Sequence, residues 1–240
     1  MTESQTMPFE RLHSGSTELE TIVFERRSVR GYTDQPVPRE LLEEIVRIAQ
    51  RAPSSMNTQP WHFHVLTGEP LERVRTGNTE KMLAGSSVDR EIPLSHGYGG
   101  VHRDRQVEIA VQLFEAMGIA RDDKARRQDW VMRGFRQFDA PVSVVVTVDT
   151  ELANDTIAHF DCGAATYGLV LAAWSKGLGT VINGQGIMQS SVVRENAGIP
   201  DDQVIMTCVA MGYPDEDFVA NHVQSRRVVT AAMASFVGFD

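Results

Sequence analysis

The sequence is poor in cysteine, since only Cys162 and Cys208 occur among 240 residues and each lies inside an apolar run. Such cysteines are typical of buried, reduced thiols rather than of a disulfide framework or a redox pair. Basic residues are also scarce: 23 lysines and arginines stand against 32 aspartates and glutamates, which gives a formal net charge of −9. This deficit argues against general nucleic-acid binding, which needs a basic face.

Long hydrophobic runs are absent as well. The longest, Gly168 to Trp174, is far too short to span a bilayer. Residues 1–16 are polar and show neither an apolar core nor a small-residue cleavage site, so we expect a flexible lead-in and no signal peptide. We therefore expect a cytoplasmic protein that inserts into no membrane.

Hydrophobic periodicity predicts a mixture of helices and strands. A helix is expected from about residue 17 to 26, where Thr17 and Glu20 resemble a capping box, and a second one before Pro53. The pattern predicts further helices over 105–117, 120–138, 159–176 and 189–197, and strands over 61–65, 140–148 and 204–211 and within 177–186. Because helices and strands alternate only partly, we expect an α+β or mixed α/β fold with a central sheet.

Three segments have weaker signals. Residues 68–104 show no clear periodicity, so we predict an irregular excursion of the kind that forms a lid or binding loop. Asp161, near the start of a predicted helix, is expected to cap it. The tail from Pro214 to Asp240 has no regular pattern and is expected to wrap over a partner subunit. His62 and His64 form an H-x-H pair without further ligands nearby, so we expect no metal site.

The segment Arg26-Arg27-Ser28-Val29-Arg30 concentrates three guanidinium groups and a hydroxyl in five positions. Guanidinium groups suit phosphates and the polar edge of a heterocycle, although a solvated basic turn would have the same composition. The loop from Pro53 to Trp61 is dense in hydrogen-bonding side chains, and its two prolines limit its conformations. The glycines of 177–186 let a ligand approach the backbone and leave amide groups free to donate.

Aromatic residues are few, and several fall in or near the predicted excursion. Trp130, Phe135 and Phe138 are compatible with a plain core or with a pocket for a flat ring. Tyr98 adds a further candidate for stacking on an aromatic ligand.

Together these segments resemble the flavin-dependent nitroreductase family. They occur in the family's order and cover about residues 20 to 228. The matching elements are Arg26-Arg27-Ser28-x-Arg30, Ala52-Pro53-Ser54-Ser55-x-Asn57-x-Gln59-Pro60-Trp61, Asp161 with its apolar helix, Gly177-Leu178-Gly179 and Ser225-Arg226. Residues 114–119 and 138–141 resemble the branch that includes nitrobenzoate and dinitroaniline reductases.

The resemblance implies a nitroreductase-like fold with a mainly antiparallel sheet flanked by helices. It also implies an intertwined homodimer with two FMN molecules at the interface. Residues 17–240 would form a single FMN-binding domain, with a substrate-facing excursion around 68–136 and a C-terminal arm over 214–240.

Site residues are carried over from the family residue by residue. One set would contact the phosphate and the pyrimidine edge of FMN: Arg26, Arg27, Ser28, Arg30, Arg136, Arg226 and Arg227. Arg227 would replace the charge of a lysine that many members have where this chain has Gln224. A second set would come from the other subunit: Pro53, Ser54, Ser55 and Asn57. A backbone N–H of Asn183, Gly184 or Gln185 would face flavin N5. Apart from the family positions, Tyr98, Phe135 and Phe138 are candidates for stacking on an aromatic acceptor, and each is equally compatible with a core position.

The implied activity is reduction of a nitroaromatic or quinone-like acceptor by NADH or NADPH, in ping-pong turnover through flavin N5. No catalytic side chain is named, because water can protonate the product. Two alternatives remain. One is reductive dehalogenation, although the deiodinase branch places a threonine hydroxyl near N5 where this chain has Asn183-Gly184-Gln185. The other is a flavin-storage dimer without efficient turnover.

Overall fold

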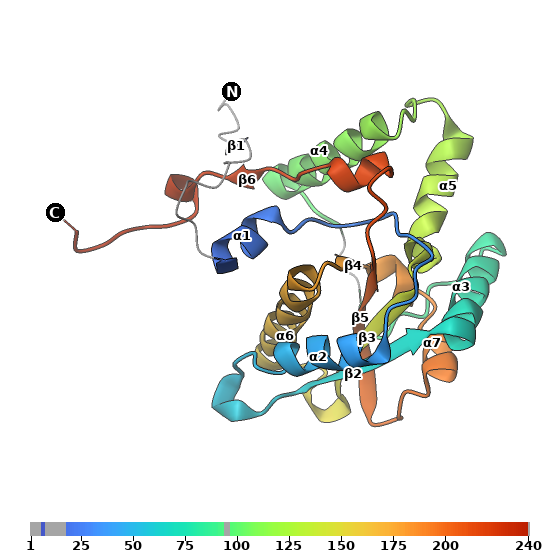
Figure 1. The fold of residues 1–240 in the computed structure, drawn as a ribbon, viewed down its shortest axis with the longest axis horizontal. Helices are drawn as coiled ribbons and strands as arrows, with labels where there is room; N and C mark the ends of the chain where they lie inside the picture. The colour runs from blue at the N-terminus through green and yellow to red at the C-terminus, as the bar shows by residue number, and fades with distance from the viewer. Residues whose placement is uncertain (1–5, 8–17, 94–96, 240) are drawn as a thin grey trace.

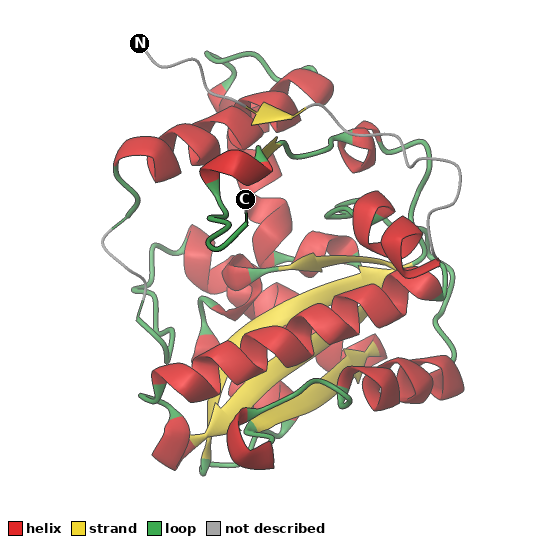
Figure 2. Ribbon diagram, turned by 90° about the vertical axis from the view of Figure 1, so that its left-hand side faces the viewer, coloured by secondary structure: helices red, strands yellow, loops and turns green. Residues whose placement is uncertain are grey.

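A four-stranded antiparallel sheet forms the centre of the fold, in the strand order β2–β3–β5–β4. The computed structural model describes residues 6–7, 18–93 and 97–239. Its central strands are β2 (Trp61–Thr67), β3 (Val142–Asp149), β4 (Gly179–Ile182) and β5 (Gln203–Gly212). Helices lie on both sides of the sheet (Figure 1, Figure 2), which confirms the predicted α+β class.

The described part of the chain also contains seven α-helices, most of which pack around this sheet (Figure 1). They are α1 (Glu18–Glu25), α2 (Arg39–Ala49), α3 (Gly68–Leu83), α4 (Gly100–Ala116), α5 (Lys124–Phe135), α6 (Thr156–Ser175) and α7 (Ser190–Ala197). A two-stranded sheet joins the ends of the chain, with β1 (Thr6–Met7) antiparallel to β6 (Arg227–Val228). Over residues 18–93 and 97–239, no helix combines the length and hydrophobicity that a bilayer span requires.

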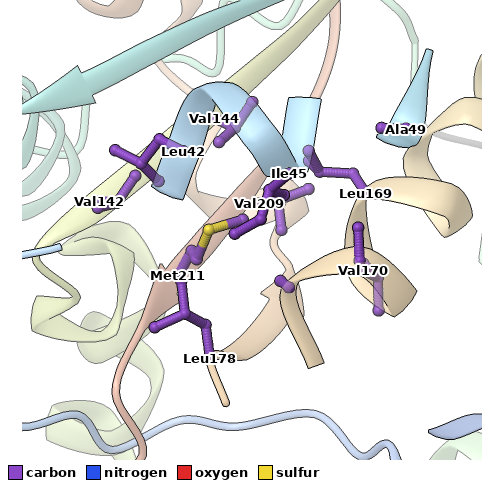
Figure 3. Close-up of a cluster of buried hydrophobic side chains, with 12 residues drawn as sticks. Leu42, Ile45, Ala49, Val142, Val144, Leu169, Val170, Leu178, Val209 and Met211 are labelled. Carbon is purple, nitrogen blue, oxygen red and sulfur yellow. The ribbon is translucent and has the colours of Figure 1, made fainter. Parts of the chain in front are cut away.

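Strand β3 is buried on both faces because valine occupies five of its eight positions. β-Branched side chains pack well on a pleated surface. Val142 and Val144 pack with residues of α2 and α6, whereas Val145 packs with residues of α3 and α7. Figure 3 shows the first of these clusters, in which Ile45 is fully buried. Burial of such a side chain contributes about 1.5–3 kcal/mol, so the two clusters fix the helices on the sheet.

The prediction that residues 68–104 are irregular is wrong over α3 and over the start of α4. Only Leu71, Val74 and Asn78 are buried along α3, which is too few to give a clear periodic pattern. Gly77 weakens the helical signal further, yet its missing side chain leaves room for Val192 of α7. A Cβ at Gly77 would lie 2.6 Å from Cγ1 of Val192.

Asp161 does not cap α6, and the prediction of that role is wrong. The cap is Asp155, whose Oδ1 accepts hydrogen bonds from the backbone N–H groups of Ile157 (2.7 Å) and Ala158 (3.4 Å). Asp161 lies more than a turn further on, is buried, and accepts a 2.9 Å hydrogen bond from the backbone N–H of Ser55. It therefore tethers the Pro53–Trp61 loop to α6. The expected capping role of Thr17 lies outside the described residues.

The structure also places the H-x-H pair and the two cysteines. His62 contacts Asp149 at 2.8 Å, and His64 contacts Gln203 at 2.8 Å. Among the described residues no group of three or more histidines, cysteines or carboxylates could hold a metal ion. Both cysteines are buried and unpaired, and burial raises the pKa of Cys162 to about 11 and of Cys208 to about 12. They are therefore protonated, unreactive thiols at neutral pH.

The two aspartates of α6 can be distinguished by mutation. Asp161→Ala should lower the free energy of unfolding by about 1–3 kcal/mol, because the Ser55 N–H loses a charged acceptor. Asp155→Ala should lower it by about 1 kcal/mol through loss of the helix cap. Hydrogen exchange then separates the two roles: the Ser55 amide should exchange faster in Asp161→Ala and at the wild-type rate in Asp155→Ala. Unchanged exchange at Ser55 in both variants would contradict the tether.

Candidate functional site

The basic segment Arg26–Arg30 runs in extended conformation from the end of α1 along the edge strand β4. Ser28 forms a parallel bridge with Thr180, and the backbone N–H of Val29 donates to the carbonyl of Thr180 at 2.9 Å. Val29 is buried, and because alternate side chains of an extended segment point to opposite sides, Ser28 and Arg30 point away from the core. The sheet edge thus fixes the direction of the two side chains.

A cavity of about 430 Å3 lies beside this segment, and we call it the basic cavity. It brings together residues from both ends of the chain, as the neighbouring positions of α1 and the C-terminal segment in Figure 1 indicate. Its lining includes six of the predicted site residues, namely Arg26, Arg27, Ser28, Arg30, Arg226 and Arg227. One acidic residue, Glu25, also lines it, so the lining is strongly cationic.

Several guanidinium groups of the basic cavity have unused hydrogen-bonding capacity. The Nε atoms of Arg26 and Arg27 are buried and have no hydrogen-bond partner in the protein. Arg27 lies over the ring of Trp174, with 5.4 Å between Cζ and the ring centroid. Arg226 forms an ion pair with Glu108 of α4 at 3.0 Å. Arginine donors arranged in this way suit an anion with several acceptor oxygens, such as a phosphate.

A second cavity of about 520 Å3, the inner cavity, shares Arg30 and Ile109 with the first. Its lining includes the aromatic rings of Trp130 and Phe138 together with Arg90 and several aliphatic side chains, but no aspartate or glutamate. A flat, apolar ring system with a polar edge matches such a lining. Because the two cavities adjoin at Arg30, one ligand with an aromatic part and an anionic part could occupy both.

The loop Asn183–Gln185 forms one wall of the inner cavity and is rigidly held. The Nδ2 group of Asn183 donates to the carbonyl of Gly134 at 2.7 Å, and its backbone N–H donates to the carbonyl of Cys208 at 2.7 Å. Its Oδ1 accepts from the backbone N–H of Gln185 at 3.2 Å. This bonding presents the backbone of Gly184 to the cavity without a covering side chain.

The three predicted stacking residues occupy different environments. Phe138 lines the inner cavity, and it belongs to a run of three residues with positive φ, 60° at Gln137, 55° at Phe138 and 58° at Asp139. Backbone strain of this kind is stored where the surroundings enforce it, and here the buried Gln137 holds the turn by donating to the carbonyl of Gly186 at 3.0 Å. Phe135 is buried outside both cavities, and Tyr98 is exposed outside them.

Arg136 lines neither cavity and instead forms ion pairs with Asp139 at 3.2 Å and Asp129 at 4.0 Å. Arg133, one helical turn earlier, also lines neither cavity and also pairs with Asp139, at 3.3 Å, but it contacts the backbone of a cavity residue, Arg30. Its Nη2 donates to the carbonyl of Arg30 at 3.1 Å, and its buried Nε has no partner. The sequence pattern could not choose between the two positions, because neither the end of α5 nor its rotation was fixed by a periodic apolar face.

Burial shapes the electrostatics around Arg30. Desolvation lowers the pKa of Arg30, although an arginine remains charged at neutral pH. Burial raises the pKa of Tyr32 well above its usual value despite the opposing charges of Arg30 and Arg133. Tyr32 is therefore a neutral donor, and its hydroxyl donates to the carbonyl of Val29 at 2.7 Å.

Asn221, in the C-terminal segment, is a buried residue that sequence reasoning missed. Its Oδ1 accepts from the backbone N–H groups of Arg30 (2.7 Å) and Gly31 (3.1 Å), and its Nδ2 donates to the carbonyls of Gly31 (2.8 Å) and Asp215 (2.9 Å). Both the oxygen and the nitrogen of its side-chain amide are therefore engaged in holding the backbone at Arg30 and Gly31. Asn221 and Arg30 lie in segments without regular periodicity that are far apart in the sequence, so no sequence pattern indicates this contact.

The loop Pro53–Trp61 lies away from both cavities of its own chain. None of Pro53, Ser54, Ser55 and Asn57 lines either cavity. The loop is nevertheless highly structured: φ is 47° at Met56, 61° at Asn57 and 47° at Gln59, and the Oγ of Ser54 accepts from the backbone N–H of Gln59 at 2.9 Å. This strained loop therefore contributes no side chain to either cavity of its own chain.

The fold and the two cavities define the chain as an α+β protein with an arginine-rich cavity that adjoins a cavity lined by aromatic and aliphatic side chains. Residues 23–213 match the Nitroreductase family, and the chain belongs to that family. It is 35% identical to a chloronitrobenzene nitroreductase of Comamonas testosteroni over 91% of this chain and 96% of that protein. It is 31% identical to a 4-nitrobenzoate reductase of Pseudomonas putida over 93% of this chain and 97% of that protein.

A solved structure, of an FMN- and NADPH-dependent nitroreductase from Sphigopyxis sp. strain HMH, has the same fold. The TM-score is 0.87 at 31% sequence identity, with 93% of this chain and 100% of that chain covered. The resemblance inferred from the sequence is therefore confirmed at the level of family and fold.

The role of Asn221 can be tested by unfolding. Asn221→Ala should lower the free energy of unfolding by about 1–3 kcal/mol, because it leaves buried backbone groups of Arg30 and Gly31 without partners. The exposed Asn154 provides a matched control, and Asn154→Ala should change stability by less than about 0.5 kcal/mol. Urea titration of both variants measures the difference, and equal stability would contradict a structural role for Asn221.

Proposed function

We propose that this protein is an FMN-dependent oxidoreductase that uses NADH or NADPH to reduce nitroaromatic acceptors. The observation that carries the proposal is the junction of the two cavities at Arg30. The basic cavity suits the phosphate of FMN, and the aromatic inner cavity suits its ring system. The buried, unpartnered Nε atoms of Arg26 and Arg27 support this fit, because a phosphate would supply the missing acceptors.

The residues divide into two groups by the part of FMN that they would hold. Arg26, Arg27, Ser28, Arg226 and Arg227 would bind the phosphate, with Arg226 exchanging part of its contact with Glu108. Arg30 and Arg133 would stabilise negative charge at the pyrimidine edge. We assign to Arg133 the contact that the family resemblance implied for Arg136, because Arg133 bonds to the Arg30 backbone. The N–H groups of Asn183–Gln185 would face N5.

The redox chemistry would come from bound FMN, which takes up a hydride from the nicotinamide and passes the electrons to the acceptor. The chain's own residues bind and orient the partners in the inner cavity. Trp130 and Phe138 would stack on flat rings there. NAD(P)H and the acceptor would use the same opening in turn, which gives ping-pong kinetics. Quinones would fit the same opening.

A homodimer is part of the proposal, because the site of one chain lacks the loop that the family resemblance places there. Pro53, Ser54, Ser55 and Asn57 are rigidly held yet line no cavity of their own chain, so we infer that they complete the partner's site. An apolar stripe along α6 offers a contact surface: Ile157, Phe160 and Tyr167 are exposed, Phe160 to 77%. Tyr167 also lines the basic cavity, so an interface on this stripe would adjoin the site.

The C-terminal arm supports the same assembly. Met233, Phe236, Val237 and Phe239 are all at least 69% exposed, an unusual accumulation of apolar surface unless another chain covers it. We propose a single FMN-binding domain over residues 17–240 that pairs through α6 and this arm. We further propose that the enzyme works in the cytoplasm, where nicotinamide is available and both cysteines stay reduced.

The two alternatives are weaker. Reductive dehalogenation in the related branch involves a threonine hydroxyl near N5, and the loop Asn183–Gln185 carries no hydroxyl. A storage protein would bind flavin without an accessible route for substrates, whereas the inner cavity extends beyond the loop to Arg90 and Gln106. Turnover measurements decide between storage and catalysis.

The phosphate contacts predict flavin loss on mutation. Arg26→Ala and Arg226→Ala should each weaken FMN binding by about 10- to 100-fold, since each removes a charge-assisted contact. Arg47→Ala is a matched control, because Arg47 is exposed on α2 and lines neither cavity. Ultrafiltration followed by the visible spectrum of the retained protein measures FMN content. Full retention in both cavity variants would overturn the phosphate assignment.

Catalysis predicts a two-stage spectral change. The yellow holoprotein, mixed anaerobically with NADPH or NADH, should bleach within seconds, and 4-nitrobenzoate or nitrobenzene should then restore the oxidised spectrum. Stopped-flow absorbance of each half-reaction checks this order. A flavin that remains oxidised with both nicotinamides would exclude the reductase and favour storage.

A further inference from the structure

Arg90 is a cavity arginine that neither the sequence motifs nor the family resemblance assigns. It lines the inner cavity but not the basic cavity. Its Nη1 lies beside Gly184, since a Cβ built on that glycine would be 3.2 Å from it. Its Nε is buried without a partner, and Nη2 makes only a long contact of 3.5 Å with the carbonyl of Met206. Most donors of this guanidinium are therefore unused.

No carboxylate of the described residues pairs with Arg90. Within the described residues it forms no ion pair, and no aspartate or glutamate lines the inner cavity. Its two acidic neighbours in sequence are engaged elsewhere, Asp89 with Ser191 and Glu91 with Arg194. Arg90 is half-buried, and this burial lowers its pKa. An uncompensated charge of this kind is typical of a ligand contact.

The segment that carries Arg90 is fixed on both sides. Before it, the Nε2 group of Gln189 donates to the carbonyl of Ser87 at 3.2 Å, and the backbone N–H of Asp89 donates to the carbonyl of Met188 at 3.1 Å. After it, Glu91 forms a two-pronged ion pair with Arg194, with contacts of 2.8 Å. Glu91 also accepts from the backbone N–H of Ile205 at 2.6 Å. Arg90 is thus held at the cavity rather than displayed on a loose loop.

The chemistry around Arg90 selects one class of ligand. Trp130, Phe138, Leu113 and Val131 supply apolar and aromatic surface for a ring, and Arg90 supplies one fork of donors that matches a carboxylate. The phosphate arginines belong to the other cavity, so Arg90 is not needed there. We propose that Arg90 binds the carboxylate of the acceptor and makes the enzyme selective for nitroaromatic acids. This inference rests on the proposed function and names the substrate class of the same site.

The test compares an acid with its neutral ester. The variants are Arg90→Met and Arg90→Lys, with Arg47→Met as the control that removes an exposed arginine remote from both cavities. Holoenzyme kcat/KM is measured for 4-nitrobenzoate and for methyl 4-nitrobenzoate. In Arg90→Met the value for the acid should fall by about 10- to 100-fold and the value for the ester by less than about threefold, since only the acid loses a charged contact. Arg90→Lys should recover part of the loss, and Arg47→Met should change neither value.

A binding measurement separates this inference from the proposed function. Benzoate, which cannot be reduced, is titrated into wild-type protein and into Arg90→Lys and Arg90→Met by calorimetry. Binding should weaken in the order wild type, Arg90→Lys, Arg90→Met, whether or not the protein turns over. Three results would each overturn the proposal. The first is an equal loss of kcat/KM for acid and ester, and the second is benzoate affinity that is the same in wild type and both variants. The third is release of FMN from Arg90→Met and Arg90→Lys. Wild-type protein that reduces neither compound would instead refute the proposed function.

Discussion

The site depends on one backbone interaction, the docking of residues 28 and 29 against Thr180 at the free edge of β4. An edge strand has unpaired backbone groups, and here an extended segment from the start of the chain uses them. With Val29 buried under this edge, Ser28 and Arg30 point outward, and Arg30 lies at the junction of the two cavities. Gly179 permits the approach, because a Cβ there would lie 2.5 Å from Cγ2 of Val29.

A second constraint comes from the C-terminal segment, which secures the other side of the same residues. Asn221 bonds to the backbone of Arg30 and Gly31, and Phe218 occupies the space that a side chain at Gly31 would need. Phe218 in turn stacks on Trp130 of α5, with ring centroids 6.3 Å apart, and lies under Arg133. Segments from the start, middle and end of the chain therefore set the shape of one site, and none of them could form it alone.

The sequence predicted the parts of this arrangement that depend on local patterns. The valine-rich β3 and the apolar α6 have strong signals, and the arginines near the two ends stand in recognisable motifs. Arg90, Arg133 and Asn221 could not be found, because each owes its role to contacts across irregular or weakly periodic segments. The position of Arg90 depends on the ion pair between its neighbour Glu91 and Arg194, which lie more than a hundred residues apart. For Asp161 the local interpretation failed, since its partner, Ser55, belongs to a distant loop.

The energetics of the buried arginines show why this region serves binding rather than stability. Four arginine Nε atoms at the site, those of Arg26, Arg27, Arg90 and Arg133, are buried without a partner. A buried, unsatisfied polar group costs about 1–3 kcal/mol, and an apolar side chain at any of these positions would avoid that cost. In a chain with a net charge of −9, carboxylates are also abundant, yet none of those that the structure describes lines the inner cavity. Arg133 and Arg226 pair with Asp139 and Glu108, whereas Arg26, Arg27 and Arg90 form no ion pair within the described residues. These unpaired charges become favourable when an anionic ligand supplies the missing acceptors.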